Sequence, residues 1–198
     1  MNYIYKECVL EDIMFKDYKS SIITEKIFKD FVKKEPYYEG RFDYYMEVIM
    51  KLHELNNINS VLEIGPYKLP FVIESDVMDF RNYVEDFPIK CGKFILHNCS
   101  KTPFPIEDKA YDLVIACQVI EHMGIYGQQV NFFNELERIS NKALITLPYL
   151  WHSPLARDHH MIDKKMINVW SGGRTPTFEL ISGAENTLRI LQLYEFDK

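Results

Sequence analysis

Apolar residues recur at helical spacing in the first quarter of the chain. The segment ITEKIFKDFVKK (residues 23–34) has Thr24 as a candidate N-cap, an apolar side formed by Ile, Phe and Val, and Pro36 just beyond its end. In RFDYYMEVIMKLHELN (residues 41–56), apolar residues fall at positions 42, 45, 48, 49, 52 and 55, which is a helical period. We therefore predict two helices before residue 57.

Short strand-like runs follow these helices. They are SVLEIG (60–65), DVMDF (76–80), KFILHN (93–98), YDLVIACQV (111–119) and KALITLPY (142–149). The first and fourth are continuously apolar, as strands covered on both faces must be. GQQVNFFNELERIS (127–140) carries one apolar stripe and is predicted to be a helix, and DKKMINVW (163–170) a short one, with Met166, Ile167 and Trp170 packed inward.

The last two apolar runs, TFELISGA and LRILQLYEF, are separated only by a short turn and predict a closing antiparallel hairpin. Strands separated by crossovers, with this hairpin at the end, predict an α/β fold. We expect a Rossmann-like, open, mostly parallel sheet with added N-terminal helices. The 198 residues suit a single domain, 1–198, in which 1–57 form a helical cap and 58–198 form the α/β core.

Bulk properties narrow the class of protein further. The net charge of −6 disfavours nucleic acid as a partner, because phosphate contacts need a basic face. No apolar run approaches the ~20 residues that span a bilayer, and the N-terminus does not resemble a signal peptide. The four cysteines form no CxxC pair, which favours a reducing cytoplasm. The 26 Phe and Tyr residues can supply a homodimer interface.

Polar residues stand at the ends of three predicted strands. Glu63 and Gly65 close the first strand, Asp79 closes the second, and Asn98 closes the third. In open α/β sheets, ligands bind beyond the carboxyl ends of the central strands. An acid after the second strand suits a ribose diol, because one carboxylate accepts hydrogen bonds from both hydroxyls. The spacing therefore predicts a nucleoside-containing ligand at this edge.

The block HNCSKTPFPIEDKAYDLVIACQVIEHM resembles the core of class I S-adenosylmethionine (SAM) dependent methyltransferases of the methyltransferase-11-like type. The counterparts of the family's motifs are residues 98–104, 111–114 and 119–122, while VLEIG resembles the first motif and NELERISNKALITLPY the helix and fifth strand. The resemblance spans about residues 60–150. It implies SAM as cofactor, with seven candidate contacts: Glu63, Gly65, Pro66, Asp79, Asn98, Cys99 and Gln118.

Two departures from the family pattern bear on the ligand. The loop GPYKLP has one glycine, with Pro66, Tyr67 and Leu69 where a dinucleotide site would have more glycines. A pyrophosphate needs bare backbone, whereas SAM has no phosphate, so the loop disfavours NAD more than SAM. Glu63 is predicted to anchor the ammonium group of SAM directly or through water.

Asn98 stands where the family has Asp, and its amide oxygen is predicted to accept from the adenine amino group, or alternatively to cap a turn.

Histidines supply the candidate bases. His122 belongs to the Val-Ile-Glu-His turn that resembles the family's Glu-His pair, or alternatively caps a helix. The connection LPYLWHSPLARDHHMID holds His152, His159 and His160, and we favour His160 or His159 as general base because histidine titrates near neutrality. An ordinary solvated loop and a zinc site are the alternatives, although no cysteine accompanies these histidines, and no metal is predicted.

Three functional classes follow. The first is a cytoplasmic SAM-dependent methyltransferase acting on a small-molecule or sugar-like acceptor, with no nucleic-acid or membrane partner. The second is a non-catalytic, methyltransferase-like partner or scaffold that has lost or weakened cofactor binding. The third, a nicotinamide dehydrogenase, is disfavoured by the missing glycine fingerprint.

Overall fold

The computed structural model describes residues 18–123, 127–152, 161–184 and 187–196. Both predicted N-terminal helices are present, as α2 (Glu25–Val32) and α3 (Phe42–Glu54), with a short α1 (Tyr18–Ser21) before them and a 3-10 helix η1 (Pro36–Arg41) between them. Thr24 caps α2 as predicted, because its Oγ1 accepts a hydrogen bond from Ile27 N at 3.3 Å. None of the helices in these ranges is long and apolar enough to cross a bilayer.

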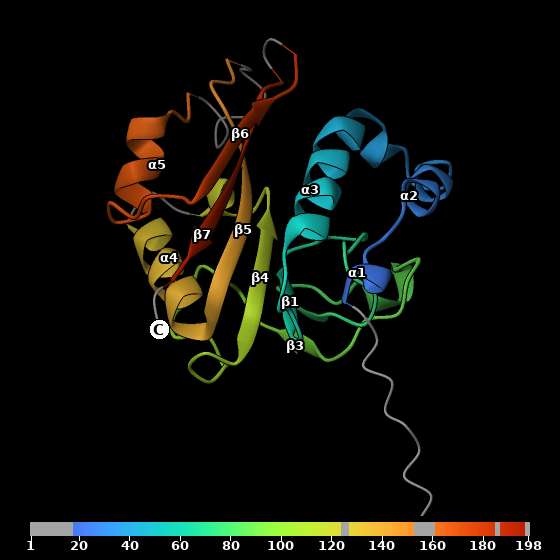
Figure 1. The fold of residues 1–198 in the computed structure, drawn as a ribbon, viewed down its shortest axis with the longest axis horizontal. Helices are drawn as coiled ribbons and strands as arrows, with labels where there is room; N and C mark the ends of the chain where they lie inside the picture. Colours follow the sequence, from blue (N-terminus) through green and yellow to red (C-terminus); the bar gives the residue numbers. More distant parts are fainter. Residues whose placement is uncertain (1–17, 124–126, 153–160, 185–186, 197–198) are drawn as a thin grey trace, which may run out of the picture.

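Seven strands of the described chain form one sheet, in the order β3-β2-β1-β4-β5-β7-β6 (Figure 1). They are β1 Val61–Ile64, β2 Asp76–Asp79, β3 Phe94–Leu96, β4 Tyr111–Cys117, β5 Ser140–Pro148, β6 Phe178–Ser182 and β7 Arg189–Glu195. Strands β1 to β5 run parallel, and β7 is antiparallel to both β5 and β6. The predicted mostly parallel sheet with an antiparallel C-terminal hairpin is confirmed.

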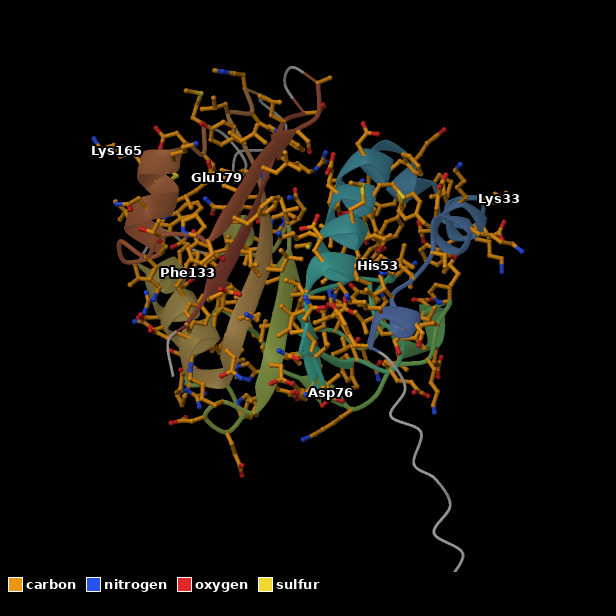
Figure 2. The ribbon with its side chains drawn as sticks, viewed as in Figure 1. Lys33, His53, Asp76, Phe133, Lys165 and Glu179 are labelled. Atoms are coloured by element: carbon orange, nitrogen blue, oxygen red, sulfur yellow. The ribbon has the colours of Figure 1, made fainter. Side chains whose placement is uncertain are left out.

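Different helices cover the two faces of the sheet. Helices α4 (Gln128–Ile139) and α5 (Lys164–Trp170) lie on one face, and α1 to α3 lie on the other (Figure 1). Phe133, one member of the predicted α4 stripe, is fully buried between α4 and the sheet (Figure 2). Along β1, Leu62 and Ile64 face α4, so the alternation of a strand turns Glu63 toward the N-terminal helices.

Helix α5 differs from its predicted packing at one residue. Asp163 Oδ1 accepts a hydrogen bond from Met166 N at 2.7 Å and so caps the helix. Ile167 is buried, and Trp170 packs against the core three residues later, on the same side. Met166 was predicted to point inward, but it is 38% exposed. It precedes Ile167 by one residue and therefore lies about 100° around the helix from the buried side.

The first crossover, residues 65–75, contains no helix. The chain instead runs as an extended loop whose backbone bonds to the segment before α2. Ile23 N donates to Phe71 O at 2.9 Å, and Ile73 N donates to Ser21 O at 2.7 Å. Leu69 and Phe71 are buried in this loop. A buried loop needs partners for its peptide groups, and the N-terminal segment supplies them.

Side chains of the N-terminal helices complete this support. Tyr38 Oη accepts a hydrogen bond from Lys68 N at 3.0 Å, and Tyr45 Oη donates to Leu69 O at 3.2 Å. Lys68 Nζ also pairs with Glu35 at 2.8 Å. The N-terminal region therefore occupies the place where a crossover helix would otherwise cover β1, and it is an integral part of the described core.

Candidate active site

A cavity of about 570 Å³ opens beyond the carboxyl ends of β1, β2, β3 and β4. Its walls come from η1 and α3, from the β1–β2 loop, and from the residues that follow β2, β3 and β4. Seven of the predicted site residues line it: Gly65, Pro66, Asp79, Asn98, Cys99, Gln118 and His122. A pocket of this size falls within the ~300–1,000 Å³ typical of small-molecule and cofactor sites.

Gly65 allows the chain to turn sharply out of β1. Its φ of +62° lies in the left-handed region, and its N–H donates to Met78 O at 2.9 Å. A Cβ added at Gly65 would lie 3.0 Å from Val119 Cγ2. A single glycine is therefore required here for both backbone conformation and space. Pro66 and Tyr67 continue the wall, and Leu69 turns away into the core.

Asp79 holds its carboxylate at the end of β2, beside the cavity. Its Oδ1 accepts a hydrogen bond from Arg81 N at 3.2 Å, and the backbone of Tyr67 also bonds to the carboxylate. Burial raises the pKa of Asp79, while these backbone donors oppose the shift. The side chain is 6% exposed and fixed in place, so it is suited to accept hydrogen bonds from a ligand diol.

Asn98 closes its own turn. Its Oδ1 accepts from Ser100 N at 3.0 Å and from Ser100 Oγ at 2.8 Å, which is the turn-capping alternative. The amide oxygen that was predicted to face adenine is therefore engaged by Ser100 in this structure. Cys99 lies next to it, and burial raises the pKa of its thiol to about 12, so the thiol stays neutral.

The turn after β4 places Gln118 and His122 on the opposite side of the cavity from Asp79 and Asn98. Gln118 has φ +57°, and its Nε2 donates to Thr146 Oγ1 at 3.1 Å. This bond fixes the amide group at the end of β4. His122 ends the 3-10 helix η3 (Ile120–His122) and lines the cavity, so it is the candidate base that the described structure places at the site.

The histidine-rich connection after β5 lies largely outside the described residues. His159 and His160, the favoured bases, belong to that part, as do two of the three ligands of the alternative zinc site. His152 is described and exposed. Within the described ranges, no group of three His, Cys, Asp or Glu side chains is placed to hold a metal ion.

Glu63 does not line the cavity. Its Oε2 accepts from Phe71 N at 2.7 Å, and its Oε1 accepts from Val72 N at 2.8 Å and from Ser75 Oγ at 2.9 Å. Both oxygens thus accept hydrogen bonds from the crossover loop, at residues that do not belong to the part of the loop next to Gly65. The geometry does not support the predicted direct contact between Glu63 and an ammonium group. Glu63 instead fixes the loop that carries Pro66 and Tyr67.

Glu63 should make the stability of the protein depend on pH. Burial raises its pKa from 4.5 to about 7, against the three hydrogen bonds that favour the carboxylate. The pKa of Glu63 is thus higher in the folded protein than in the unfolded chain. Its stabilising contribution to the free energy of unfolding is therefore fully present below pH 4.5 and is lost as pH rises toward about 7. Relative to Glu63→Gln, which cannot titrate, the wild-type free energy of unfolding should fall by about 3 kcal/mol across that window. Urea unfolding at several pH values measures this difference, and a constant difference would contradict the expectation.

The sequence predicted that the N-terminal helices roof the substrate pocket, but it did not single out which of their residues line the cavity. Tyr37, Tyr38, Arg41 and Tyr44 line it from η1 and the start of α3. The segment PYYEGRFDYY holds four tyrosines and an arginine within ten residues. Residues 45, 48, 49 and 52 form the apolar stripe predicted from the helical period. Tyr37, Tyr38 and Tyr44 are not part of that stripe. Aromatic residues beyond those that the helix needs for its buried side were the feature of the sequence that could have indicated a cavity wall here.

Several solved structures with a similar fold are methyltransferases. Magnesium protoporphyrin IX methyltransferase (ChlM) from Synechocystis PCC 6803, with bound S-adenosylhomocysteine (SAH), matches with TM-score 0.61 and 10% identity over 87% of this chain and 94% of ChlM. The N-methyltransferase NodS from Bradyrhizobium japonicum WM9, in complex with SAH, matches with TM-score 0.57 and 8% identity over 87% of this chain and 97% of NodS. The chain has the class I methyltransferase fold.

A third structure with this fold is a SAM-dependent methyltransferase from Thermotoga maritima, described as a possible histamine N-methyltransferase. It matches with TM-score 0.56 and 12% identity over 87% of this chain and 100% of its own. No family model matches the sequence, and no curated protein matches it significantly. At such low identities the likeness extends to the methyltransferase fold alone, so the function must be argued from the site.

Proposed function

We propose that the protein is an enzyme that binds SAM and transfers its methyl group to a small-molecule acceptor. One observation carries the proposal: a single cavity brings together Gly65, Asp79 and Gln118, which lie at the carboxyl ends of β1, β2 and β4. The sequence motifs and the fold support the same ligand independently. A positively charged, phosphate-free cofactor also suits a loop with one glycine and an acidic side chain beside it.

The chain's own residues would bind and orient the cofactor. Gly65 gives space for close approach, Asp79 accepts hydrogen bonds from the ribose hydroxyls, and Gln118 offers a neutral amide near the end of β4. Cys99, being neutral and partly buried, offers an apolar contact near the adenine side. Bound SAM would supply an electrophilic methyl group on a positively charged sulfur.

If the acceptor is a hydroxyl or a protonated amine, a base must take its proton. His122 is suited to this role by its position in the cavity wall, and His159 and His160 stay candidates from the sequence. The cap residues Tyr37, Tyr38 and Tyr44 would enclose a small or sugar-like acceptor and exclude water from it.

Calorimetric titration tests the proposal against its alternatives. SAM and SAH should bind with micromolar affinity, about −8 kcal/mol, and raise the melting temperature. NADH, titrated by fluorescence, should give no signal, because the loop lacks the glycines that a pyrophosphate requires. Absence of heat and of thermal shift with SAM and SAH would favour the non-catalytic partner, and NADH binding would favour the dehydrogenase.

A further inference from the structure

The cavity has two chemically different halves. Asp79 ends β2, and Asn98 and Cys99 follow β3, while Cys117 and His122 belong to the end of β4 and the turn after it. Strand β1 separates these groups in the sheet order. The half over β2 and β3 has the acid expected for a ribose. The half over β4 is therefore the space left for the acceptor.

Arg41 is the cation of this second half. Its side chain lines the cavity, and its guanidinium carbon lies 3.6 Å from the centre of the Tyr37 ring. Its Nη1 donates to Tyr37 O. No carboxylate of the described residues forms an ion pair with it. The guanidinium is thus held by an aromatic ring and one carbonyl, which leaves other N–H donors for a ligand.

A second guanidinium, that of Arg189, lies near Arg41. Arg189, at the start of β7, lies between Tyr44 and Trp151, with its guanidinium carbon 4.7 Å and 5.1 Å from their ring centres. Its Nε is buried and has no hydrogen-bond partner in the described chain. Burial lowers the pKa of Arg189, and the positive charge of Arg41 acts in the same direction. The two cations are therefore near enough to repel each other.

One carboxylate opposes these two positive charges. The buried Glu121 acts on Arg189 in the direction that favours its charged form. Glu121 therefore favours the charged form of Arg189, whereas no carboxylate of the described residues forms an ion pair with Arg41. Tyr44, which is 7% exposed and lines the cavity, lies against the guanidinium of Arg189 and supplies an aromatic surface.

We propose that the acceptor carries an oxyanion, a carboxylate or a phosphate, which the guanidinium of Arg41 binds beside Tyr37 and Tyr44. The planar fork of arginine matches either group with two parallel hydrogen bonds. The positive charge of Arg41, which has no ion pair within the described residues, would attract the anion, and the aromatic rings would hold an apolar or aromatic body attached to it. This inference rests on the proposed function and adds the chemical class of the acceptor.

Binding of simple probes tests it. Benzoate and phenyl phosphate, each compared with the neutral benzamide, are titrated into the protein with and without SAH. Both anions, or one of them, should bind about tenfold more tightly than benzamide and should weaken as salt is raised. The comparison between the two anions shows whether carboxylate or phosphate is preferred. Equal binding of benzamide, or no binding of either anion at about 10 mM, overturns the proposal.

Variants assign the preference to Arg41. Arg41→Gln should lose the roughly tenfold preference for the anion, while Arg41→Lys, which keeps the charge without the fork, should retain part of it. Lys33→Gln is the matched control, because Lys33 points into solvent from the end of α2 (Figure 2) and its side chain is 74% exposed. It removes the same charge and should change nothing. Melting curves check that each variant is folded. A preference that survives in a folded Arg41→Gln overturns the proposal.

The same experiment separates failure of this inference from failure of the proposed function. Binding of the anions through Arg41 without any SAH binding would contradict the methyltransferase proposal and keep the anion site. SAH binding without any preference for anions would keep the methyltransferase proposal and refute the anionic acceptor.

Discussion

The Asp79→Asn variant is expected to bind SAH about 100-fold more weakly than the wild type. The Asp79 carboxylate is 6% exposed, held by backbone donors, and placed at the cavity wall. An ionised carboxylate accepts from both ribose hydroxyls, and each hydrogen bond to a charged group contributes about 1.5–3 kcal/mol. Asparagine keeps one accepting oxygen and turns an NH₂ donor toward the second hydroxyl. Calorimetry on purified, folded variants measures the loss.

Asp30→Asn is the control for this prediction. Asp30 forms a surface pair with Lys33 at 2.7 Å on α2, and its side chain is 54% exposed. The change removes the same charge at a site remote from the cavity and should leave SAH affinity unaltered. If Asp79→Asn bound SAH as well as Asp30→Asn does, Asp79 would have no contact with the ribose, and the proposed orientation of the cofactor would be wrong.

The fold was predictable because its determinants are local. The continuous apolar runs of β1 and β4 and the stripe of α4 follow from which faces each element buries. The spacing of 14 residues between Gly65 and Asp79 also left little room for a crossover helix, and the structure has none there. Met166 shows the limit of this reasoning, since a seven-residue helix gives too few positions to fix its buried side.

The site was predictable where a residue lies at a strand end or in the turn after it. Gly65, Asp79, Asn98 and Gln118 reach the cavity because parallel strands end at one edge of the sheet. Glu63 lies one residue before the end of β1, and its side chain was assigned to the ligand although the strand alternation turns it toward the cap. Arg41 and its neighbouring tyrosines reach the cavity through tertiary packing of η1 and α3, which sequence periodicity does not encode.

Glu63→Ala is expected to lower the free energy of unfolding by about 3–5 kcal/mol at about pH 5, where the contribution of Glu63 is near its maximum. The change leaves the N–H groups of Phe71 and Val72 without the acceptor they have in the wild type, whereas the Ser75 hydroxyl keeps Val72 O, at 2.8 Å, as an acceptor. Each buried donor without a partner costs about 1–3 kcal/mol. Glu63→Gln keeps one accepting oxygen, so its loss should be intermediate. Urea unfolding followed by circular dichroism measures both.

Glu25→Ala provides the comparison, since Glu25 pairs with Lys29 at 2.5 Å on the surface of α2 and the two side chains are 55% and 60% exposed. An exposed pair of this kind contributes less than about 1 kcal/mol. The contrast separates two roles for Glu63. If it fixes the crossover loop, stability falls in Glu63→Ala, and SAH affinity falls with it because Pro66 and Tyr67 lose their support. If Glu63→Ala kept full stability and still lost SAH binding, Glu63 would contact the cofactor itself, as the sequence had suggested.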